Sequence, residues 1–480
     1  MKVSRFPSAA AIAIALTCLS PVPVHAQEPV VQTTAVATSD DWRENYAYAV
    51  GLQAVIYGYP AVKALNMRYS MVEKVVSVID TPVNALFHNR RAADPTDANH
   101  SSVASDFLYS VAWYDVRREP VVITVPDSGD RYYSVQFMEF YSDIFAYLGT
   151  RATRGKAGNY MLVDADWEGE TPAGIASVIR APTPTGAVLV RVGFRDDRTK
   201  LKPAHQLQDA SSVRTFSKWL ADDPLPATDR DVVDPAAPGS SLAFYVSLNR
   251  AMTENPPPAK DRAIVSLLRS VGLGTGQSDD LSQLDAGTRR GLERAFKDGM
   301  NLLSQTSIAG GETKIVNHWA YNQMTWGRTG ENDDFLTRSA TQSFSGFLEH
   351  KIEEVVKLRA HFDGDGEILD GSSGRYVLHF GPNEIPEAKA FWSVTVYNAE
   401  YNLFANPLER YSIGSLDKGL RYDKDGGLTF YIQADAPAKQ YMSNWLPVPK
   451  APFNLFLRAY LPGEDLIGQE YVPPAVTKVN

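Results

Sequence analysis

Apolar residues recur every three or four positions near the start of the chain, at Tyr46, Val50, Ala54, Tyr57 and Ala61. This spacing gives a helix one apolar face, and it predicts a helix from about Trp42 to Lys63. Pro60 lies within that range and cannot donate a backbone hydrogen bond, so we expect the helix to kink or break there.

The pattern changes to that of strands from Phe107 onward. The segment VVITV at Val121–Val125 is expected to be a buried run, and apolar and polar residues alternate in Tyr133–Phe137. The segment PDSGD between them is typical of a turn, which predicts a hairpin within a larger sheet. Further strand-like segments, NYMLVD and GAVLVRVGF, are separated by Gly and Pro, as is typical of a β-sandwich.

Short helical stretches occupy the middle of the chain, where Pro- and Gly-rich segments separate them. The clearest predicted helix runs from about Ala286 to Leu303, and a second apolar periodicity predicts another from Asp334 to Phe362. This region is therefore expected to be a small helical domain or insertion.

The C-terminal part returns to alternating segments, namely RYVLHF, AFWSVTVYN, GLTFYIQA and FNLFLRAYLP. They predict a second β-sandwich or jelly roll. The fold class is thus mainly β with helical insertions, an α+β protein with two β domains bridged by a helical segment. The expected parts are a signal peptide (1–26), a flexible leader (27–40), a helix plus β-sandwich domain (41–205), a largely helical linking region (206–362) and a β-sandwich or jelly-roll domain (363–480).

The first residues have the features of a secretory signal. Lys2 and Arg5 precede the apolar run Ala9–Leu19, and small residues follow up to Ala26, where cleavage is expected. We therefore expect a periplasmic or secreted protein. The apolar run is too short to span a bilayer, and no later segment is long enough, so no transmembrane segment is predicted. Cys18 is the only cysteine and lies within the signal, so no disulfide is expected after cleavage.

Composition narrows the class of partner. A chain that is 44% hydrophobic and 11% aromatic is globular, and its net charge of -9 disfavours binding to nucleic acid. The histidines do not show the spacing of a zinc site, so no metal is predicted from a motif, although a metal site assembled from distant residues stays open. The cofactor is unknown, because no motif indicates one. A homo-oligomer stays open as well.

Two long segments resemble a known family. They are FLYSVAWYDVRREPVVITVPDSGDRYYSVQFMEFYSDIFAYLGTR in the N-terminal half and FWSVTVYNAEYNLFANPLERYSIGS with NWLPVPKAPFNLFLRAYLP in the C-terminal half. The chain resembles proteins with paired domains of unknown function, numbered 1254 and 1214, and the resemblance implies two β-sandwich domains bridged by helices. It brings no assigned reaction. The family pattern Pro-Asn-x-Asp-Thr-Leu-Tyr-Ser keeps Asp106, Tyr109 and Ser110 here, but Ala104 and Phe107 replace its Asn and Thr.

Asp106 is the candidate catalytic acid. It begins a strand with mainly aromatic neighbours, where partial burial would raise the pKa of its carboxyl and suit it to proton transfer. His88 lies in an upstream loop and is a candidate partner, because histidine changes its protonation near neutral pH. The alternative is that Asp106 caps a turn or pairs with an arginine, and that His88 is structural.

Several polar and aromatic residues near strand ends are candidate ligand-binding residues, because loops at the ends of a rigid sheet often carry function. Guanidinium groups beside aromatic rings suit a carboxylated or phenolic ligand. The alternative is that these residues lock corners of the fold. The candidates are Tyr109, Arg131, Arg151, Arg410, Tyr411, Asn444 and Trp445.

Two functional hypotheses follow. In the first, the exported protein binds a small organic molecule in an aromatic-lined pocket between its β domains, and converts it by acid–base chemistry as a hydrolase or lyase. In the second, it is a non-catalytic envelope protein that oligomerises or recognises a glycan or a protein, since exposed Tyr and Trp also suit such contacts. The serine-hydrolase pattern Gly-x-Ser-x-Gly is absent after residue 26.

Overall fold

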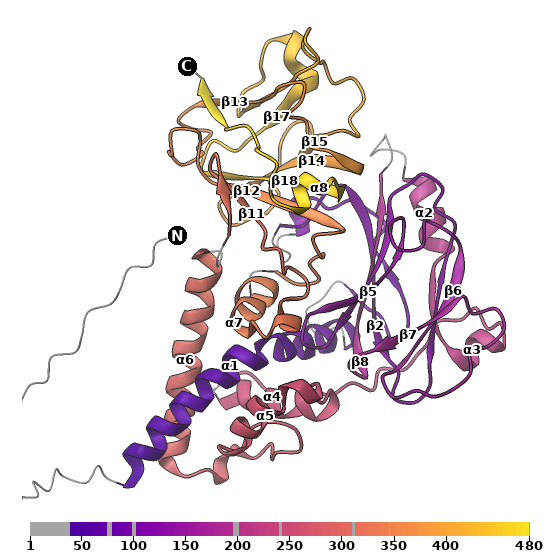
Figure 1. The fold of residues 1–480 in the computed structure, drawn as a ribbon, viewed down its shortest axis with the longest axis vertical. Coiled ribbons are helices and arrows are strands. Elements are labelled where there is room, and N and C mark those ends of the chain that lie inside the picture. Colours follow the sequence, from indigo (N-terminus) through magenta and orange to yellow (C-terminus); the bar gives the residue numbers. More distant parts are fainter. Residues whose placement is uncertain are drawn as a thin grey trace, which may run out of the picture.

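The computed structural model describes residues 39–73, 79–97, 102–194, 201–239, 242–309, 313–344 and 346–479. Two β domains and a helical layer make up the molecule (Figure 1). About 29% of the structure is helical and 27% is strand, which confirms the predicted α+β class. The predicted signal peptide lies outside the described residues, as does most of the predicted leader.

The long first helix, α1 (Ser39–Val72), packs against a second long helix, α6 (Ala286–Ala309), beside the N-terminal β domain (Figure 1). The two helices approach closely because α6 presents glycines to its partner. A Cβ on Gly291 would lie 2.3 Å from the carbonyl oxygen of Glu44, and one on Gly299 would lie 2.8 Å from a methyl of Val55. The helices are α1 (Ser39–Val72), α2 (Lys202–Asp209), α3 (Phe216–Leu220), α4 (Leu242–Glu254), α5 (Arg262–Arg269), α6 (Ala286–Ala309), α7 (Phe335–Thr337) and α8 (Glu464–Ile467), with a π-helix, η5 (Arg338–Phe344), and a 3-10 helix, η6 (Lys439–Asn444).

The predicted break at Pro60 is wrong, because α1 continues through this residue to Val72. Proline leaves the carbonyl four residues earlier without its usual backbone donor. That carbonyl belongs to Ile56, and the hydroxyl of Ser339 in η5 donates a hydrogen bond to it. A neighbouring carbonyl, that of Tyr57, accepts a hydrogen bond of 3.0 Å from Arg338. The π-helix therefore supplies the donors that allow α1 to pass through proline.

The N-terminal domain is a sandwich of two sheets. The larger has the order β1 (Phe87–His88), β2 (Phe107–Asp115), β8 (Thr185–Gly193), β4 (Tyr133–Glu139) and β5 (Ile144–Gly149), and the smaller has the order β7 (Ser177–Ala181), β6 (Gly158–Asp164), β3 (Val121–Val125) and β9 (Ser212–Thr215). In β2, Leu108 and Ala112 face the smaller sheet, whereas Val111 and Trp113 face the helices. The larger sheet is thus buried on both faces, which explains its continuous apolar strands.

The hairpin predicted from Val121–Val125 and Tyr133–Phe137 is wrong, although both segments are strands. β3 pairs with β6 and β9 in the smaller sheet, and β4 pairs with β5 and β8 in the larger one. The turn between them crosses from one sheet to the other, because each strand finds more apolar neighbours in the sandwich than a local hairpin would offer.

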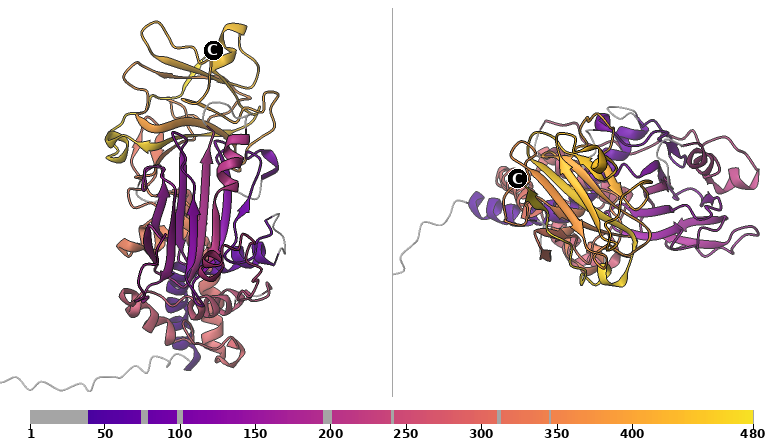
Figure 2. Two further views of the ribbon diagram at one scale, coloured as in Figure 1. Left: turned by 90° about the vertical axis from the view of Figure 1, so that its right-hand side faces the viewer. Right: turned by 90° about the horizontal axis from the view of Figure 1, so that it is seen from above.

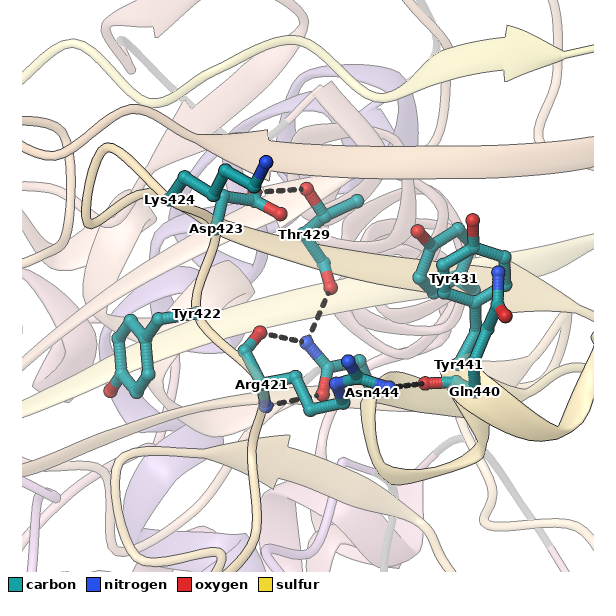
Figure 3. Close-up of a pocket in the computed structure, with 9 residues that line it drawn as sticks. All are labelled: Arg421, Tyr422, Asp423, Lys424, Thr429, Tyr431, Gln440, Tyr441 and Asn444. Atoms are coloured by element: carbon teal, nitrogen blue, oxygen red, sulfur yellow. Dashed lines mark hydrogen bonds between the residues drawn. The ribbon is translucent and has the colours of Figure 1, made fainter.

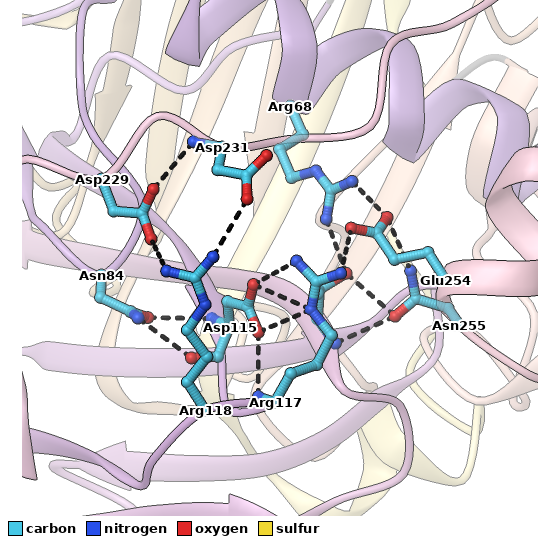
Figure 4. A network of polar contacts seen from close by, with 10 residues as sticks. Arg68, Asn84, Asp115, Arg117, Arg118, Asp229, Asp231, Glu254 and Asn255 are labelled. Carbon is cyan, nitrogen blue, oxygen red and sulfur yellow. Dashed lines mark hydrogen bonds and ion pairs between the residues drawn. The ribbon is translucent and has the colours of Figure 1, made fainter.

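A polar network fixes the helical layer to the sandwich (Figure 4). Arg68 of α1, only 1% exposed, pairs with Glu254 of α4 and donates a hydrogen bond of 2.8 Å to the Thr185 hydroxyl. Arg117, which follows β2, lies 3.2 Å from the other oxygen of Glu254. Opposite charges surround each buried group, which offsets the cost of removing it from water.

The C-terminal domain is also a two-sheet sandwich. One sheet has the order β10 (Ile315–Val316), β11 (Trp319–Tyr321), β12 (Val355–Ala360), β18 (Phe453–Pro462), β14 (Ala388–Asn398) and β15 (Ser412–Gly414), and the other has the order β17 (Trp445–Pro447), β16 (Leu428–Gln433), β13 (Arg375–Phe380) and β19 (Thr477–Val479). Alternate residues such as Trp392, Val394 and Leu457 fill its core. This domain caps one end of the N-terminal sandwich (Figure 2).

The helical linking region is shorter than residues 206–362. At its start, β9 still belongs to the N-terminal sandwich, and before its end β12 already belongs to the C-terminal one. The helix predicted from Asp334 to Phe362 is correct only in its first part, since helical structure ends at Phe344. Val355–Ala360 is instead a strand, because β11 and β18 pair with it on either side. The helix predicted at Ala286–Leu303 is confirmed as α6.

Candidate functional site

Aromatic rings fill much of the junction between the two β domains. Phe107 at the start of β2 lies 4.9 Å, between ring centroids, from Tyr460 of β18. Phe391 of β14 stacks on Tyr460 at 4.4 Å and contacts Tyr132 edge-on at 5.9 Å. Such offset and edge-on contacts are favourable, and each ring is at most 6% exposed. The aromatic density of this region therefore serves first to join the domains.

Asp106 lies at this junction and links the domains. Its carboxylate accepts hydrogen bonds from Ser393 Oγ at 2.9 Å and from Ser412 Oγ at 3.0 Å, and both serines belong to the C-terminal domain. The side chain is almost completely buried. Because serine hydroxyls from the other domain occupy both oxygens, the geometry supports the structural interpretation of Asp106 over the catalytic one.

The structure does not bring His88 to Asp106. His88 in β1 lies opposite Ser110 of β2, and its Nδ1 is 2.7 Å from the Ser110 hydroxyl. Ser110 is four residues from Asp106 along an extended chain, a span of about 13 Å. Burial, together with the nearby Arg90, lowers the pKa of His88 to about 4, so its imidazole is neutral near pH 7.

A small pocket does open between the two domains, beside the aromatic cluster. Its volume is about 90 Å³. Arg131, a predicted ligand-binding residue, lines it and donates a hydrogen bond of 2.7 Å to the carbonyl of Gly193 at the end of β8. The N-terminal domain contributes Asp130, Arg131, Tyr132, Thr150 and Phe194, and the C-terminal domain contributes Lys389, Ala390, Phe391 and Leu416.

A buried acid, Glu354, contacts a residue that lines this pocket. The Tyr132 hydroxyl donates a hydrogen bond of 2.9 Å to Glu354, and the predicted residue Arg151 pairs with the other oxygen of the same carboxylate. Glu354 is 1% exposed, and burial raises the pKa of its carboxyl, although Arg151 opposes that effect. Glu354 was not predicted from the sequence, where it lies in an apparent helix.

His350 lies close to this group. The ring of Tyr147 stacks on His350 with centroids 5.8 Å apart, and its hydroxyl is 3.2 Å from His350 Nδ1. Burial lowers the pKa of His350 well below its ordinary value, so the ring is neutral. Among the described residues, no hydrogen-bond partner reaches its buried Nε2. An unsatisfied buried nitrogen of this kind is unusual in a folded protein.

Charged side chains form a second buried group at the junction. Arg191 of β8 donates to Gln136 and to the Leu348 carbonyl, and its guanidinium is 5.7 Å from the ring of Tyr109, a predicted ligand-binding residue. Lys357 of β12 is 3.2 Å from Glu349, and burial lowers the pKa of its ammonium to about 8.

Arg458 of β18 belongs to the same group. Its guanidinium is 5.0 Å from the centre of the Phe456 ring. Sequence reasoning missed Arg191, Lys357 and Arg458. Arg191 in β8 and Arg458 in β18 are each the single cation of a largely apolar strand, whereas Lys357 shares β12 with Arg359. A single cation in an apolar strand is a signal that its strand face is covered by polar groups from elsewhere in the fold.

The remaining predicted residues lie in the C-terminal domain, away from the junction pocket. Arg410 donates hydrogen bonds to the carbonyls of Met442 at 3.1 Å and Trp445 at 2.8 Å, and the Trp445 indole donates to the carbonyl of Gln433 at 2.8 Å. These contacts fix a corner of the fold, as the structural alternative predicted. Tyr411 is half-buried and packs beside a small apolar cluster, where burial raises its pKa.

Asn444 lines a second, larger pocket, which has a volume of about 350 Å³ (Figure 3). This pocket lies on the outer face of the four-stranded C-terminal sheet. The side-chain amide nitrogen of Asn444 donates hydrogen bonds to the carbonyls of Arg421 and Thr429 at 2.8 and 2.9 Å. The side-chain oxygen of Asn444 accepts one from the backbone N–H of Arg421 at 2.8 Å. Asn444 therefore shapes the floor of the pocket.

Comparison with protein families tests the resemblance to the paired domains of unknown function that the sequence indicated. Residues 83–215 match the family described as "Protein of unknown function (DUF1254)", and residues 354–464 match "Protein of unknown function (DUF1214)". The chain is a paired DUF1254–DUF1214 protein. The DUF1254 match spans the N-terminal sandwich from before β1 to the end of β9, and the DUF1214 match covers most of the C-terminal one.

A solved structure of TM-score 0.70 supports the same fold. The VPA0106 protein from Vibrio parahaemolyticus is 24% identical, with a TM-score of 0.70, over 90% of this DUF1254–DUF1214 chain and 100% of that protein. A putative uncharacterized protein from Burkholderia cenocepacia is 14% identical, with a TM-score of 0.45, over 92% of this chain and 95% of that one. Comparison with curated proteins gave no match. Within the described ranges, no helix combines the length and apolar character needed to span a membrane.

Proposed function

We propose that this protein binds a small organic anion in the pocket between its two β domains. The observation that carries the proposal is the composition of the lining, where Tyr132 and Phe391 provide aromatic surface from opposite domains and Arg131 and Lys389 provide positive charge. Ligand sites typically combine apolar walls with a few polar groups and often lie between domains.

The pocket is small. Its volume of about 90 Å³ lies below the range of about 300–1,000 Å³ that is typical of small-molecule sites, which favours a small carboxylate. Asp130 also lines the pocket, but two cations against one carboxylate leave the lining positive. A guanidinium binds a carboxylate with directional, charge-assisted hydrogen bonds.

An acid–base mechanism requires proton transfer at this pocket. In our proposal, Tyr132 and Glu354 carry out that transfer. Tyr132 lines the pocket, and its hydroxyl reaches the buried carboxyl of Glu354, whose raised pKa suits proton exchange. Asp106 and His88 are left out of this role, because their side chains bond to Ser393, Ser412 and Ser110, none of which lines the pocket.

Thermal unfolding with added carboxylates tests the binding proposal. A ligand that binds only the folded protein stabilises it by about 2.7 kcal/mol at a hundredfold excess over its dissociation constant. We expect acetate or propionate to raise the melting temperature of the wild type, and Arg131→Gln and Lys389→Gln to reduce that rise. Arg269→Gln, on the exposed surface of α5, is the matched control and should keep it. An equal rise in all four proteins would reject the pocket.

We also propose export, with cleavage near Ala26, on the basis of the signal-like first residues. N-terminal sequencing of the protein from a bacterial host's periplasmic fraction tests this. A mature chain that begins at or near Gln27 would support the proposal, and an intact Met1 in that fraction would contradict it.

A further inference from the structure

The larger pocket has the features of a separate binding site. It lies where the segment Arg421–Lys424, the outward-facing side chains of β16 and the helix η6 meet, and its volume is about 350 Å³ (Figure 3). That volume falls in the range of about 300–1,000 Å³ in which proteins hold small-molecule ligands. It is several times larger than the pocket between the domains.

Tyrosines mark both ends of this pocket, but they are oriented differently (Figure 3). Tyr431 of β16 and Tyr441 of η6 lie side by side at one end with ring centroids 4.4 Å apart and planes inclined by 33°, and Tyr441 is 38% exposed. The ring of Tyr422, at the opposite end, points away from the other lining side chains (Figure 3). Exposed aromatic rings that gather at one pocket mark a surface suited to binding.

Polar groups occupy the space between the rings. Arg421 donates a hydrogen bond of 3.0 Å to the carbonyl of Gln440, and the Thr429 hydroxyl donates one of 2.8 Å to Asp423. Together with the contacts of Asn444, these bonds hold the floor in one arrangement before a ligand arrives, which lowers the entropic cost of binding.

The lining mixes donors and acceptors. Arg421 and Lys424 are cationic donors, whereas the carboxylate of Asp423 only accepts. A carboxylate within the lining opposes a phosphate or another multiply charged anion. A sugar hydroxyl both donates and accepts, so it matches a mixed lining, and the C–H face of a sugar ring packs on tyrosine.

We propose that this pocket binds an oligosaccharide, with a sugar ring packed on Tyr441 and hydroxyl groups bonded to the polar floor beside it. The site is independent of the pocket between the domains, so either proposal can fail without the other. It belongs entirely to the C-terminal domain and needs no chemical step.

Calorimetric titration of the purified protein with maltohexaose, cellohexaose and chitohexaose tests the proposal, with inorganic phosphate as the anionic probe. We expect saturable binding of at least one hexasaccharide and none of phosphate. Tyr441→Ala should weaken that binding by about tenfold, and Tyr441→Phe should keep most of it, because the ring remains. Tyr422→Ala should leave it unchanged, because that ring points away from the site.

The matched control is Tyr46→Ala, which removes a tyrosine of similar exposure from α1. It should leave saccharide affinity unchanged. Melting curves establish that each variant is folded, which is expected because the substituted rings are partly exposed. The proposal is overturned if no hexasaccharide binds, if phosphate binds instead, or if Tyr441→Ala binds as tightly as the wild type.

Discussion

At the scale of single residues, single cations within apolar strands mark the surface where the domains meet. Arg458 of β18 donates a hydrogen bond of 2.8 Å to the carbonyl of Ser102 in the N-terminal domain, and Arg191 of β8 donates one of 2.8 Å to the carbonyl of Leu348, which lies outside that domain. Their positions could be read from the sequence, but their partners could not. The serines that bind Asp106, for example, lie 287 and 306 residues away, beyond the reach of any periodic pattern.

The pKa of His88 provides a prediction at this scale. Burial disfavours the charged imidazole and lowers its pKa from 6.5 to about 4. The unfolded chain therefore takes up a proton between these values that the folded chain does not, so His88 makes the free energy of unfolding fall as the pH drops from 6.5 to 4. An NMR titration should show the His88 ring titrating near pH 4.

The variant His88→Gln identifies the resonance and serves as the comparison for stability. Its free energy of unfolding should depend less on pH than that of the wild type between pH 4 and 6.5. A His88 resonance that titrates near pH 6.5 would show that the ring is not buried as described.

At the scale of elements, the alternation of apolar and polar residues predicted where strands lie. It did not predict which strands pair. β14, β16 and β18 follow from the alternation of residues such as Trp392, Phe430 and Leu457, because that pattern is local. The pairing of β3 and β4 with separate sheets depends on distant strands, so the local turn suggested a hairpin. Val355–Val356 fitted a helical period, and only pairing with β11 and β18 makes this segment a strand.

The passage of α1 through Pro60 gives a prediction for this scale. Ser339→Ala removes the donor to the Ile56 carbonyl and should cost about 1–3 kcal/mol of unfolding free energy, since that carbonyl is then unsatisfied. Pro60→Ala restores a backbone N–H to the same carbonyl. Ser339→Ala should therefore cost less in the Pro60→Ala background, as urea unfolding of the four proteins can measure. Equal costs in both backgrounds would mean that the hydroxyl does not replace the missing N–H.

At the scale of the whole molecule, the two β domains should unfold together, because aromatic rings and hydrogen bonds join them. Asp106→Ala removes two charge-assisted hydrogen bonds to the C-terminal domain and should cost roughly 3 kcal/mol. Calorimetry should show one transition for the wild type, and two, or one broadened transition, for this variant. The exposed substitution Glu168→Ala should leave the wild-type curve unchanged. An unaltered curve for Asp106→Ala would show that Asp106 does not couple the domains.

The central claim is that a small anion binds between the domains, and a crystal structure grown with saturating propionate tests it most directly. The account predicts a carboxylate within hydrogen-bonding distance of Arg131, with its carbon atoms against Tyr132 and Phe391. Water alone in that pocket at saturating propionate, or propionate bound only elsewhere, would contradict it.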